Sequence, residues 1–300
     1  MSFRPPPHDR SIDERLAFGV INVDKPPGPS SHQVVTWVKE ILGIERAAHA
    51  GTLDPKVTGC LPILLGDATR LARAILHGKK RYVAVLELHD RPPARFDDVV
   101  ASFEGPIYQK PPRKSAVTRR LRTRTIYRLD ALEVSEREAL LDITCESGTY
   151  IRKLCHDLGL VLGVGGHMGD LRRIGTEPFD DRDLHTLHGL SDALAIAEAG
   201  ESHELETMIQ PGERALTHLP SVTIAPSAAE SVANGAPVYA PGIIECDAVS
   251  ADDTPLVACY TPDGVAICLG HLVGDPAAET GEVVSLERVL VDPGSRNASA

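Results

Sequence analysis

Residues 48–62 read AHAGTLDPKVTGCLP, a stretch that places a carboxylate, a histidine, two glycines and two prolines in one short segment. Because glycine permits turns that other residues avoid and proline fixes its own backbone, this density predicts a shaped loop. Pro55 pushes the preceding residue, Asp54, out of the helical region and into an extended conformation. The carboxylate of Asp54 is therefore either aimed at a functional site or engaged in an Asx-type turn, and spacing alone leaves both open.

The segments on both sides of this loop show strand and helix patterns. Residues 18–23 form a short apolar run, and Ser30 with Gln33 predicts the start of a helix that ends at Gly43. Residues 80–88 place Tyr82 and every second residue after it on one face, which predicts a strand. A tyrosine at such a position usually fills a core, so a function for Tyr82 needs a further argument.

A second helix is predicted after Gly148, where Ile151 begins an apolar stripe at i, i+3, i+4 and i+7 that reaches Leu158. Arg152 lies off this stripe near the helix start, where the positive end of the helix dipole disfavours a cation. Something outside the helix must therefore hold Arg152 there, unless it is an ordinary surface arginine.

These motifs resemble the TruB family of pseudouridine synthases, and more closely its archaeal dyskerin type, the catalytic subunit of H/ACA guide-RNA particles. The resemblance spans about residues 18–291 and rests on four motifs in order: 49–55 with Gly59 and Leu61, then 79–82, 148–152 and 171–173. It implies an α+β pseudouridine synthase fold with a mixed, largely antiparallel sheet, followed by a small PUA-like β-barrel.

The resemblance also implies a reaction, the isomerisation of a uridine in RNA to pseudouridine. Asp54 would be the catalytic carboxylate, as a nucleophile or as a base that removes a sugar proton. Tyr82 would stack on the target base, and Arg152 would pair with Asp54 and keep it ionised. The residues implied to bind the substrate are His49, Lys25, Tyr150 and Leu171, although the lysine that Lys25 matches is either structural or RNA-facing. No metal and no organic cofactor is required.

The net charge of −11 argues against a nucleic-acid partner until the chain is divided. Residues 183–300 contain 18 acidic and 3 basic residues, which leaves 24 acidic and 28 basic in residues 1–182. The net charge is therefore −15 in residues 183–300 and +4 in residues 1–182. Residues 105–129 contain eight basic residues and no acidic one. Such a run is either a solvated loop or a segment that contacts phosphate groups. Our candidates for RNA-backbone contact are Lys110, Arg113, Lys114, Arg119 and Arg120. With 8 Lys against 23 Arg, the acidic excess also suggests a salt-rich cytosol, as in a halophilic archaeon.

Three hundred residues predict two domains. We expect a flexible N-terminal arm over residues 1–17, a pseudouridine synthase catalytic domain over 18–214 and a PUA-like RNA-binding domain over 215–295. The alternative for the segment before Phe18 is that it folds back onto the barrel. After Leu219 the chain changes to short apolar runs separated by Gly and Pro, which is typical of the strands of a small barrel.

Several classes of protein are disfavoured. No apolar run approaches the roughly 18 residues of a membrane span, and the N-terminus lacks the apolar core of a signal peptide, so we expect a cytoplasmic protein. The six cysteines include no C-x-x-C pair, so neither a zinc site nor a disulfide framework is indicated. Residues 163–169 are glycine-rich without the spacing of a dinucleotide fingerprint.

Two other functions stay open. A non-catalytic RNA-binding scaffold would keep the basic run and the barrel but would not need Asp54, Tyr82 and Arg152 together. A hydrolase using His49 and Asp54 would need a nucleophile or a metal-ligand set, which we do not find. Bacterial TruB proteins carry an insertion that grips tRNA, whereas only a short stretch follows Leu88 here. This departure favours an H/ACA guide RNA and its target, with small protein subunits of an H/ACA particle, over stand-alone recognition of tRNA. The resemblance to the archaeal branch, which is similar to enzymes that do both, keeps tRNA as a further expected RNA partner.

Overall fold

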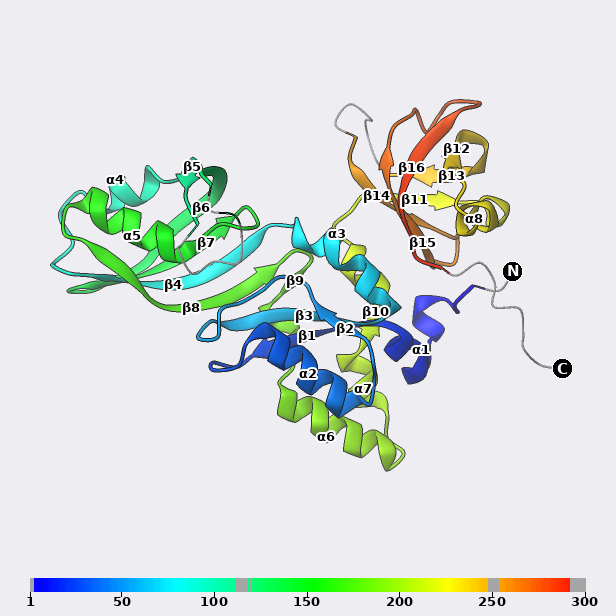
Figure 1. Cartoon of the computed structure of the whole chain (residues 1–300), viewed down its shortest axis with the longest axis horizontal. Helices are drawn as coiled ribbons and strands as arrows, with labels where there is room; N and C mark the ends of the chain where they lie inside the picture. The colour runs from blue at the N-terminus through cyan, green and yellow to red at the C-terminus, as the bar shows by residue number, and fades with distance from the viewer. Residues whose placement is uncertain (1–2, 112–117, 119, 248–253, 292–300) are drawn as a thin grey trace.

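Two sheets organise the structure, one large and central and one smaller and C-terminal (Figure 1). The computed structural model of the chain describes residues 3–111, 118, 120–247 and 254–291. In these residues the α-helices are α1 (Ile12–Ala17), α2 (Ser31–Leu42), α3 (Ala72–Leu76), α4 (Phe96–Ala101), α5 (Ile151–Leu162), α6 (Leu187–Glu198), α7 (His203–Met208) and α8 (Pro226–Ala233). The 3₁₀ helices are η1 (Pro7–Asp9), η2 (Asp67–Leu71), η3 (Asp181–Asp183), η4 (Gly212–Leu216) and η5 (Ala240–Gly242).

The large sheet has ten strands in the order β10-β1-β3-β8-β4-β7-β6-β5, with β2 added to β3 and β9 to β8. Its strands are β1 (Phe18–Lys25), β2 (Ala47–His49), β3 (Thr58–Gly66), β4 (Lys80–Leu88), β5 (Gly105–Gln109), β6 (Arg122–Val134), β7 (Glu138–Cys145), β8 (Gly166–Thr176), β9 (Phe179–Asp180) and β10 (Gln210–Pro211). All of these described pairings are antiparallel except that of β3 with β8. The predicted mixed, largely antiparallel sheet is confirmed, and the strand predicted over 80–88 is β4.

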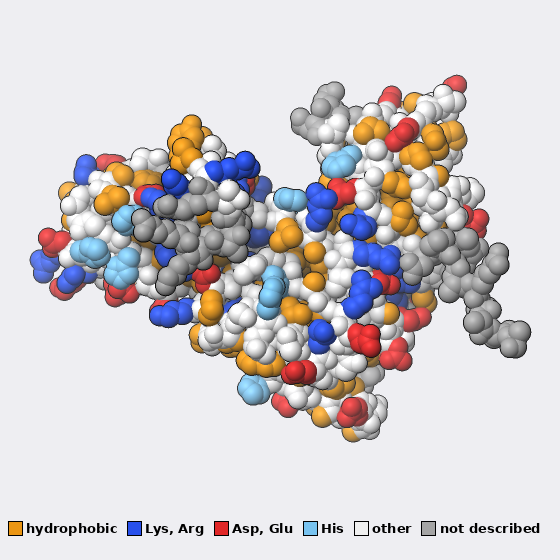
Figure 2. Space-filling model, in the orientation of Figure 1, with side chains coloured by type: hydrophobic (Ala, Val, Ile, Leu, Met, Phe, Trp, Pro, Cys, Tyr) orange, Lys and Arg blue, Asp and Glu red, His pale blue; other side chains and the backbone are white. Residues whose placement is uncertain are grey.

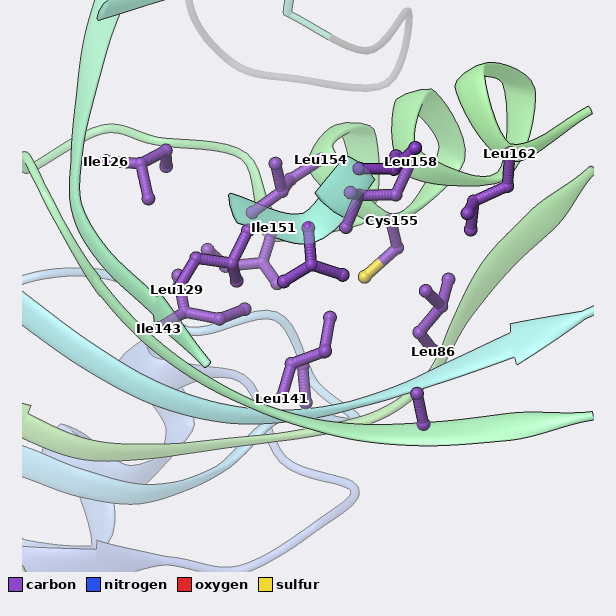
Figure 3. Close-up of a cluster of buried hydrophobic side chains, with 14 of the residues drawn as sticks. Leu86, Ile126, Leu129, Leu141, Ile143, Ile151, Leu154, Cys155, Leu158 and Leu162 are labelled. Carbon is purple, nitrogen blue, oxygen red and sulfur yellow. The ribbon is translucent and has the colours of Figure 1, made fainter. Parts of the chain in front are cut away.

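Helices pack on this sheet through the apolar stripes that the sequence predicts. Helix α5 packs Leu154 and Leu158 against β4 and β7, where Leu86 and Leu141 are fully buried (Figure 3). Helix α2 begins where the Ser30 hydroxyl accepts a hydrogen bond from the Gln33 N–H at 3.2 Å. Below β1 and β3 in Figure 1, α2, α6 and α7 bury a second cluster, to which the sheet contributes its alternate residues.

The smaller sheet has six strands in the order β12-β16-β15-β14-β11-β13. Its strands are β11 (Ser221–Ile224), β12 (Val238–Tyr239), β13 (Ile243–Cys246), β14 (Leu256–Tyr260), β15 (Ala266–Leu272) and β16 (Glu282–Val289). The strands and α8 enclose their own apolar core, centred on fully buried Val222, Val257 and Ile267. This is the small PUA-like barrel that was expected.

The barrel and the large sheet share a further apolar cluster. Phe18 of β1 and Leu71 of η2 lie in one buried group with Leu269 and Leu290 from the barrel end of the chain. The barrel is therefore seated against the outer side of β1 and η2. The division at residues 214 and 215 stays a prediction, since this cluster takes residues from both sides of it.

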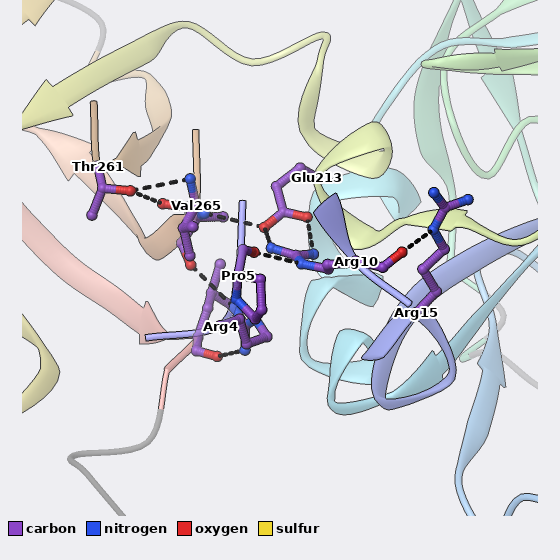
Figure 4. A network of polar contacts seen from close by, with 9 residues as sticks. Arg4, Pro5, Arg10, Arg15, Glu213, Thr261 and Val265 are labelled. Atoms are coloured by element: carbon purple, nitrogen blue, oxygen red, sulfur yellow. Dashed lines mark hydrogen bonds and ion pairs between the residues drawn. The ribbon is translucent and has the colours of Figure 1, made fainter. Parts of the chain in front are cut away.

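The N-terminal arm expected to be flexible over residues 1–17 is instead packed into this junction over its described part, residues 3–17 (Figure 4). The Arg10 guanidinium forms two hydrogen bonds with the Glu213 carboxylate, at 2.7 and 2.8 Å, and Arg10 is only 3% exposed. Arg4 stacks 3.6 Å from the centre of the Phe18 ring and donates to the carbonyls of Leu290 and Ala266. Residues 3–17 are therefore not a free arm, because these arginines find partners that are remote in sequence, and the contacts of Arg4 agree with the alternative of a segment folded back onto the barrel.

Candidate active site

The loop between β2 and β3 carries Asp54 and is fixed from two directions. Gly51 has φ of +107°, and a Cβ at this position would lie 3.2 Å from Nη1 of Arg173, so a larger residue would be strained here. Ser31, the first residue of α2, accepts a hydrogen bond from the Leu53 N–H at 2.8 Å and donates one to the Leu53 carbonyl at 3.1 Å. The residue next to Asp54 is therefore held on both its backbone groups.

The Asp54 carboxylate faces outward and is bound by Arg152. Nη2 of Arg152 donates to Oδ2 of Asp54, and both side chains are more than half exposed. No hydrogen bond from a backbone N–H to this carboxylate occurs in the described residues, so the alternative of an Asx-type turn is not what forms. A cation at a helix start was expected to have a partner outside the helix. For Arg152 that partner is Asp54.

The start of α5 is itself anchored, which fixes the position of Arg152. The buried Gln109 side chain, at the end of β5, accepts a hydrogen bond from the Tyr150 N–H at 2.9 Å and donates to the Tyr150 carbonyl at 3.2 Å. Tyr150 is the residue before α5. Arg152 therefore projects from a helix end that is tied to a neighbouring strand.

Asp54 and Arg152 border a cavity of about 580 Å³. Its walls come from the Asp54 loop, from β4 and β8, and from the residues that lead into α5. Tyr82 of β4, Leu171 of β8 and Tyr150 all line it, so the structure brings these three sequence-predicted residues together with the ion pair. Burial raises the pKa of the Tyr82 phenol, and the adjacent Arg173 guanidinium opposes that rise. The phenol is therefore neutral at neutral pH.

Two cations in the cavity wall were not assigned to the site from the sequence. Arg173 is 1% exposed and donates to the carbonyls of Cys60 at 2.7 Å and Gly51 at 3.1 Å. Lys80 is 4% exposed, and its Nζ donates to the Ile75 carbonyl at 2.8 Å. The signal was present, because Lys80 lies two residues before Tyr82 on the same strand face. Arg173 is the cross-strand partner of Tyr82.

Two family models match the segments that form this site. The model described as "TruB family pseudouridylate synthase (N terminal domain)" matches residues 39–94 and 90–151, and "tRNA pseudouridylate synthase B C-terminal domain" matches residues 152–217. The chain belongs to the TruB family of pseudouridine synthases. A third model, "DKCLD (NUC011) domain", matches residues 5–35 and places this TruB-family synthase in the dyskerin type.

Relatives of this TruB-family synthase align over almost its full length. It is 62% identical to the probable tRNA pseudouridine synthase B of Halobacterium salinarum, over 97% of this chain and 100% of the relative. It is 45% identical to the protein of the same name in Methanopyrus kandleri, over 97% of this chain and 87% of the relative. The solved structure of a Cbf5-Nop10-Gar1 complex matches with a TM-score of 0.91 and 44% identity, covering 96% of this chain and 89% of that one. A structure of an H/ACA RNP bound to a substrate RNA containing 2′-deoxyuridine matches with a TM-score of 0.90 and 41% identity, over 97% and 90% of the two chains.

Lys25 was expected to bind the substrate, and its position in this TruB-family synthase corrects that expectation. Its side chain is fully buried, and Nζ donates to the carbonyls of Pro26, Pro55 and Val57, each at 2.9 Å. Burial lowers the pKa of this ammonium, and nearby Asp54 raises it. All three N–H donors are used inside the protein, so Lys25 supports the Asp54 loop and does not reach a substrate.

His49 was also expected to hold the substrate, but in this synthase it is not among the residues that line the cavity. It lies at the end of β2, and its Nε2 is 2.9 Å from Nδ1 of His32 on α2. Burial, with added repulsion from His32 and Arg173, lowers the pKa of His49 to about 4. The ring is therefore neutral at neutral pH and packs beside the loop.

The basic segment of the synthase is only partly described. Lys110 and Arg120 are exposed at the same end of the β5–β6 hairpin, next to Gln109, which contacts the start of α5. Arg113, Lys114 and Arg119 lie outside the described residues. The two described candidates therefore lie near Tyr150, which lines the cavity.

The described part of the chain lacks two further features. It contains no cluster of three or more His, Cys, Asp or Glu side chains that could hold a metal ion. Within the same residues, no helix is both long enough and apolar enough to cross a membrane.

Proposed function

We propose that this synthase converts specific uridines of RNA to pseudouridine with Asp54 as its catalytic carboxylate, acting on tRNA, on guided rRNA targets, or on both. The observation that carries the assignment is the ion pair between Asp54 and Arg152 beside a cavity that Tyr82 and Leu171 line. A flipped uracil needs a stacking surface, a closed space and a carboxylate near its sugar. These four residues supply all three.

In this mechanism, the uridine turns out of the RNA and its base enters the cavity. Tyr82 stacks on the ring, while Tyr150 and Leu171 complete the wall. The N1–C1′ bond breaks, and its electron pair leaves with the base. The electron-poor C1′ is then relieved by Asp54, which either forms a bond to C1′ or removes the C2′ proton.

The detached base turns so that C5 faces C1′, and a carbon–carbon bond forms as the Asp54–C1′ bond breaks or, in the other route, as C2′ regains its proton. The C5 proton is lost, N1 gains a proton, and the atoms of substrate and product are the same. Arg152 holds the Asp54 carboxylate and directs it at the sugar. Lys25 and Ser31 act indirectly, by fixing the backbone on either side of Asp54.

The RNA is held outside the cavity by arginine and lysine side chains. Lys110, Arg113, Lys114, Arg119 and Arg120 are our candidates for the backbone of the strand that carries the target. Lys and Arg side chains also gather on the face between the barrel and the lower helices (Figure 2). Basic surface of this kind supports contact with RNA phosphates although the net charge of the whole chain is negative.

We further propose that the chain works as the catalytic subunit of an H/ACA-type particle in the cytoplasm, with a guide RNA and small protein subunits. Solved relatives of similar length and fold occur in a Cbf5-Nop10-Gar1 complex and in an H/ACA RNP bound to substrate RNA. The alternative is an RNA-binding scaffold without catalysis, which would need the basic surface but not the Asp54–Arg152 pair.

Tritium release tests the proposal. The full chain is assayed at high potassium chloride on two RNAs labelled with tritium at C5 of uridine, a tRNA and a target paired to an H/ACA guide RNA. Each RNA is tested with and without the small protein subunits. We expect release from at least one RNA, with pseudouridine found at the position that lost tritium. If both RNAs bind tightly and neither releases tritium, the chain is an RNA-binding scaffold and not an enzyme.

A further inference from the structure

The buried part of the cavity wall holds two cations that have no counter-ion in the described residues. Lys80 and Arg173 both line it and are 4% and 1% exposed. Neither forms an ion pair with a carboxylate in the part of the chain that the structure describes. An ionised group removed from water destabilises a protein unless it is paired and fully hydrogen-bonded. The fold therefore maintains a positive charge here that does not serve stability.

Lys25 provides an internal comparison, because it is a second buried lysine close to the same loop. The Lys25 ammonium donates to three backbone carbonyls, one for each of its protons. The Lys80 ammonium donates to one, the carbonyl of Ile75. An ammonium has three donors, so Lys80 keeps capacity that no described acceptor uses. Lys25 is a structural lysine, whereas Lys80 is incompletely satisfied at the wall of a cavity.

The position of the two cations indicates which part of a substrate they meet. The target nucleotide stays joined to the RNA on both sides, so its phosphates remain at the mouth, near Asp54 and Arg152. The base is the part that reaches furthest in. Arg173 is the cross-strand partner of Tyr82, and Lys80 lies two residues before Tyr82 on the same face of β4, so both cations lie beside the ring that stacks on the base. The ligand of Lys80 and Arg173 is therefore the base and not a phosphate.

We propose that Lys80, together with Arg173, stabilises the negative charge that the uracil carries after its glycosidic bond breaks, an inference that rests on the proposed function. When the N1–C1′ bond breaks, the electron pair goes to N1 and spreads to the O2 and O4 oxygens, which makes the detached base an anion. The charge disappears again when C5 bonds to C1′ and the C5 proton leaves. Fixed cations placed where charge develops lower the barrier, because they need no reorganisation during the reaction.

Lys80 must be protonated to act in this way, and its surroundings set the pH at which that holds. Burial and the Arg173 guanidinium lower the pKa of Lys80 to about 7. The other groups that face it are the thiols of Cys60 and Cys145 and the side chains of Glu177 and His218. Burial raises the pKa of the two thiols to about 11 and 12 and lowers that of His218, so none of these three begins to ionise as the pH rises just above 7.

The experiment measures single-turnover isomerisation at saturating RNA, with the full chain and the RNA and subunits that support wild-type turnover. The variants are Lys80→Met, Lys80→Arg and the control Lys39→Met, which removes the same charge from α2, away from the cavity. RNA affinity and melting temperature are measured for each, and the rate is followed as the pH rises through 7. A role that is merely structural would change the melting temperature but not the pH profile.

We expect Lys80→Met to lose about 100-fold in rate, the usual effect of removing one preorganised group, with RNA affinity and melting temperature not lowered. The parent rate should fall as the pH rises through about 7. Lys80→Arg should keep most of the rate and lose this pH dependence, since a guanidinium stays charged.

Three results would overturn the inference alone, with the parent enzyme active: an unchanged rate in Lys80→Met, a loss confined to RNA affinity, or a Lys80→Arg rate as low as that of Lys80→Met. If Lys80→Met does not fold, the pH profile of Lys80→Arg decides. Absence of turnover by the parent chain would instead overturn the proposed function and this inference with it.

Discussion

Asp54 and Arg152 form an ion pair although 98 residues separate them in the chain. Each is positioned by a different support, Asp54 by Ser31 and Lys25 beneath its loop, and Arg152 by the contact of Gln109 with the start of α5. Because both side chains are more than half exposed, the pair contributes little to stability, on the order of 0–1 kcal/mol. The pair instead fixes the direction of one carboxylate.

The first prediction concerns Asp54→Asn, which replaces one carboxylate oxygen by an amide nitrogen and keeps the shape of the side chain. We expect RNA affinity close to that of the parent and no detectable tritium release, since an amide neither attacks C1′ nor accepts a proton. The melting temperature should stay unchanged because the site is exposed. Measurable turnover by a preparation free of parent enzyme would remove Asp54 from the mechanism.

Tyr82→Phe separates stacking from the hydroxyl. The phenylalanine ring keeps the stacking surface, so RNA binding and base entry should be retained. Burial raises the pKa of the Tyr82 phenol, so this hydroxyl is a poor base in the resting enzyme. If the C5 proton nevertheless leaves through it, the variant should accumulate the carbon–carbon bonded base and release tritium slowly. A release rate equal to that of the parent would show that Tyr82 is a stacking platform and nothing more.

Lys25→Met tests the support of the loop. The substitution leaves the carbonyls of Pro26, Pro55 and Val57 without their common donor inside the protein. Each buried acceptor left unsatisfied costs about 1–3 kcal/mol, and part is recovered because a buried charge is removed, so we expect a loss of about 2–4 kcal/mol in the free energy of unfolding. Denaturant unfolding measures it, with Lys39→Met as the matched control. Stability equal to the parent would return Lys25 to the list of substrate contacts.

The sequence was sufficient for features that depend on local pattern. The alternation of residues 80–88 predicted β4, and the stripe beginning at Ile151 predicted α5, because each period reflects one buried face. The position of Arg152 at a helix start also required a partner before that partner was known. In each case the information lies within a few residues.

Other features depend on contacts between distant segments. Whether Lys25 meets solvent or three carbonyls is decided by a loop some thirty residues away. Lys80 and Arg173 enter the cavity wall because β4 pairs with β8 in one register. The order of residues 3–17 depends on Glu213, to which Arg10 is bound across 203 residues of chain. These contacts join segments that are far apart in the chain, and the periodicity of a local segment does not predict them.

The contact of Arg10 with Glu213 yields a prediction about the N-terminal segment. The Arg10 side chain is fully buried and that of Glu213 is 10% exposed, so Arg10→Met leaves a buried carboxylate unpaired. We expect a loss of about 3–5 kcal/mol in unfolding free energy. Adding Glu213→Gln should recover part of it, because the amide oxygen still accepts the Ala266 N–H and carries no charge. Arg91→Met, from a pair exposed on both sides, is the control. Additive losses in the double variant would contradict a coupled pair.

The last prediction follows from the division of charge, −15 in residues 183–300 against +4 before them. The Debye length is about 30 Å at 0.01 M salt and about 3 Å at 1 M, so at low salt the acidic barrel repels itself and should loosen before the catalytic domain. RNA binding changes in the opposite direction, because added salt reduces the gain from counterion release. We therefore expect an activity optimum at high potassium chloride, with the thermal transition of the barrel rising as salt is added. Activity that declines steadily from low salt, with an unchanged melting curve, would show that the acidic excess is not an adaptation to salt.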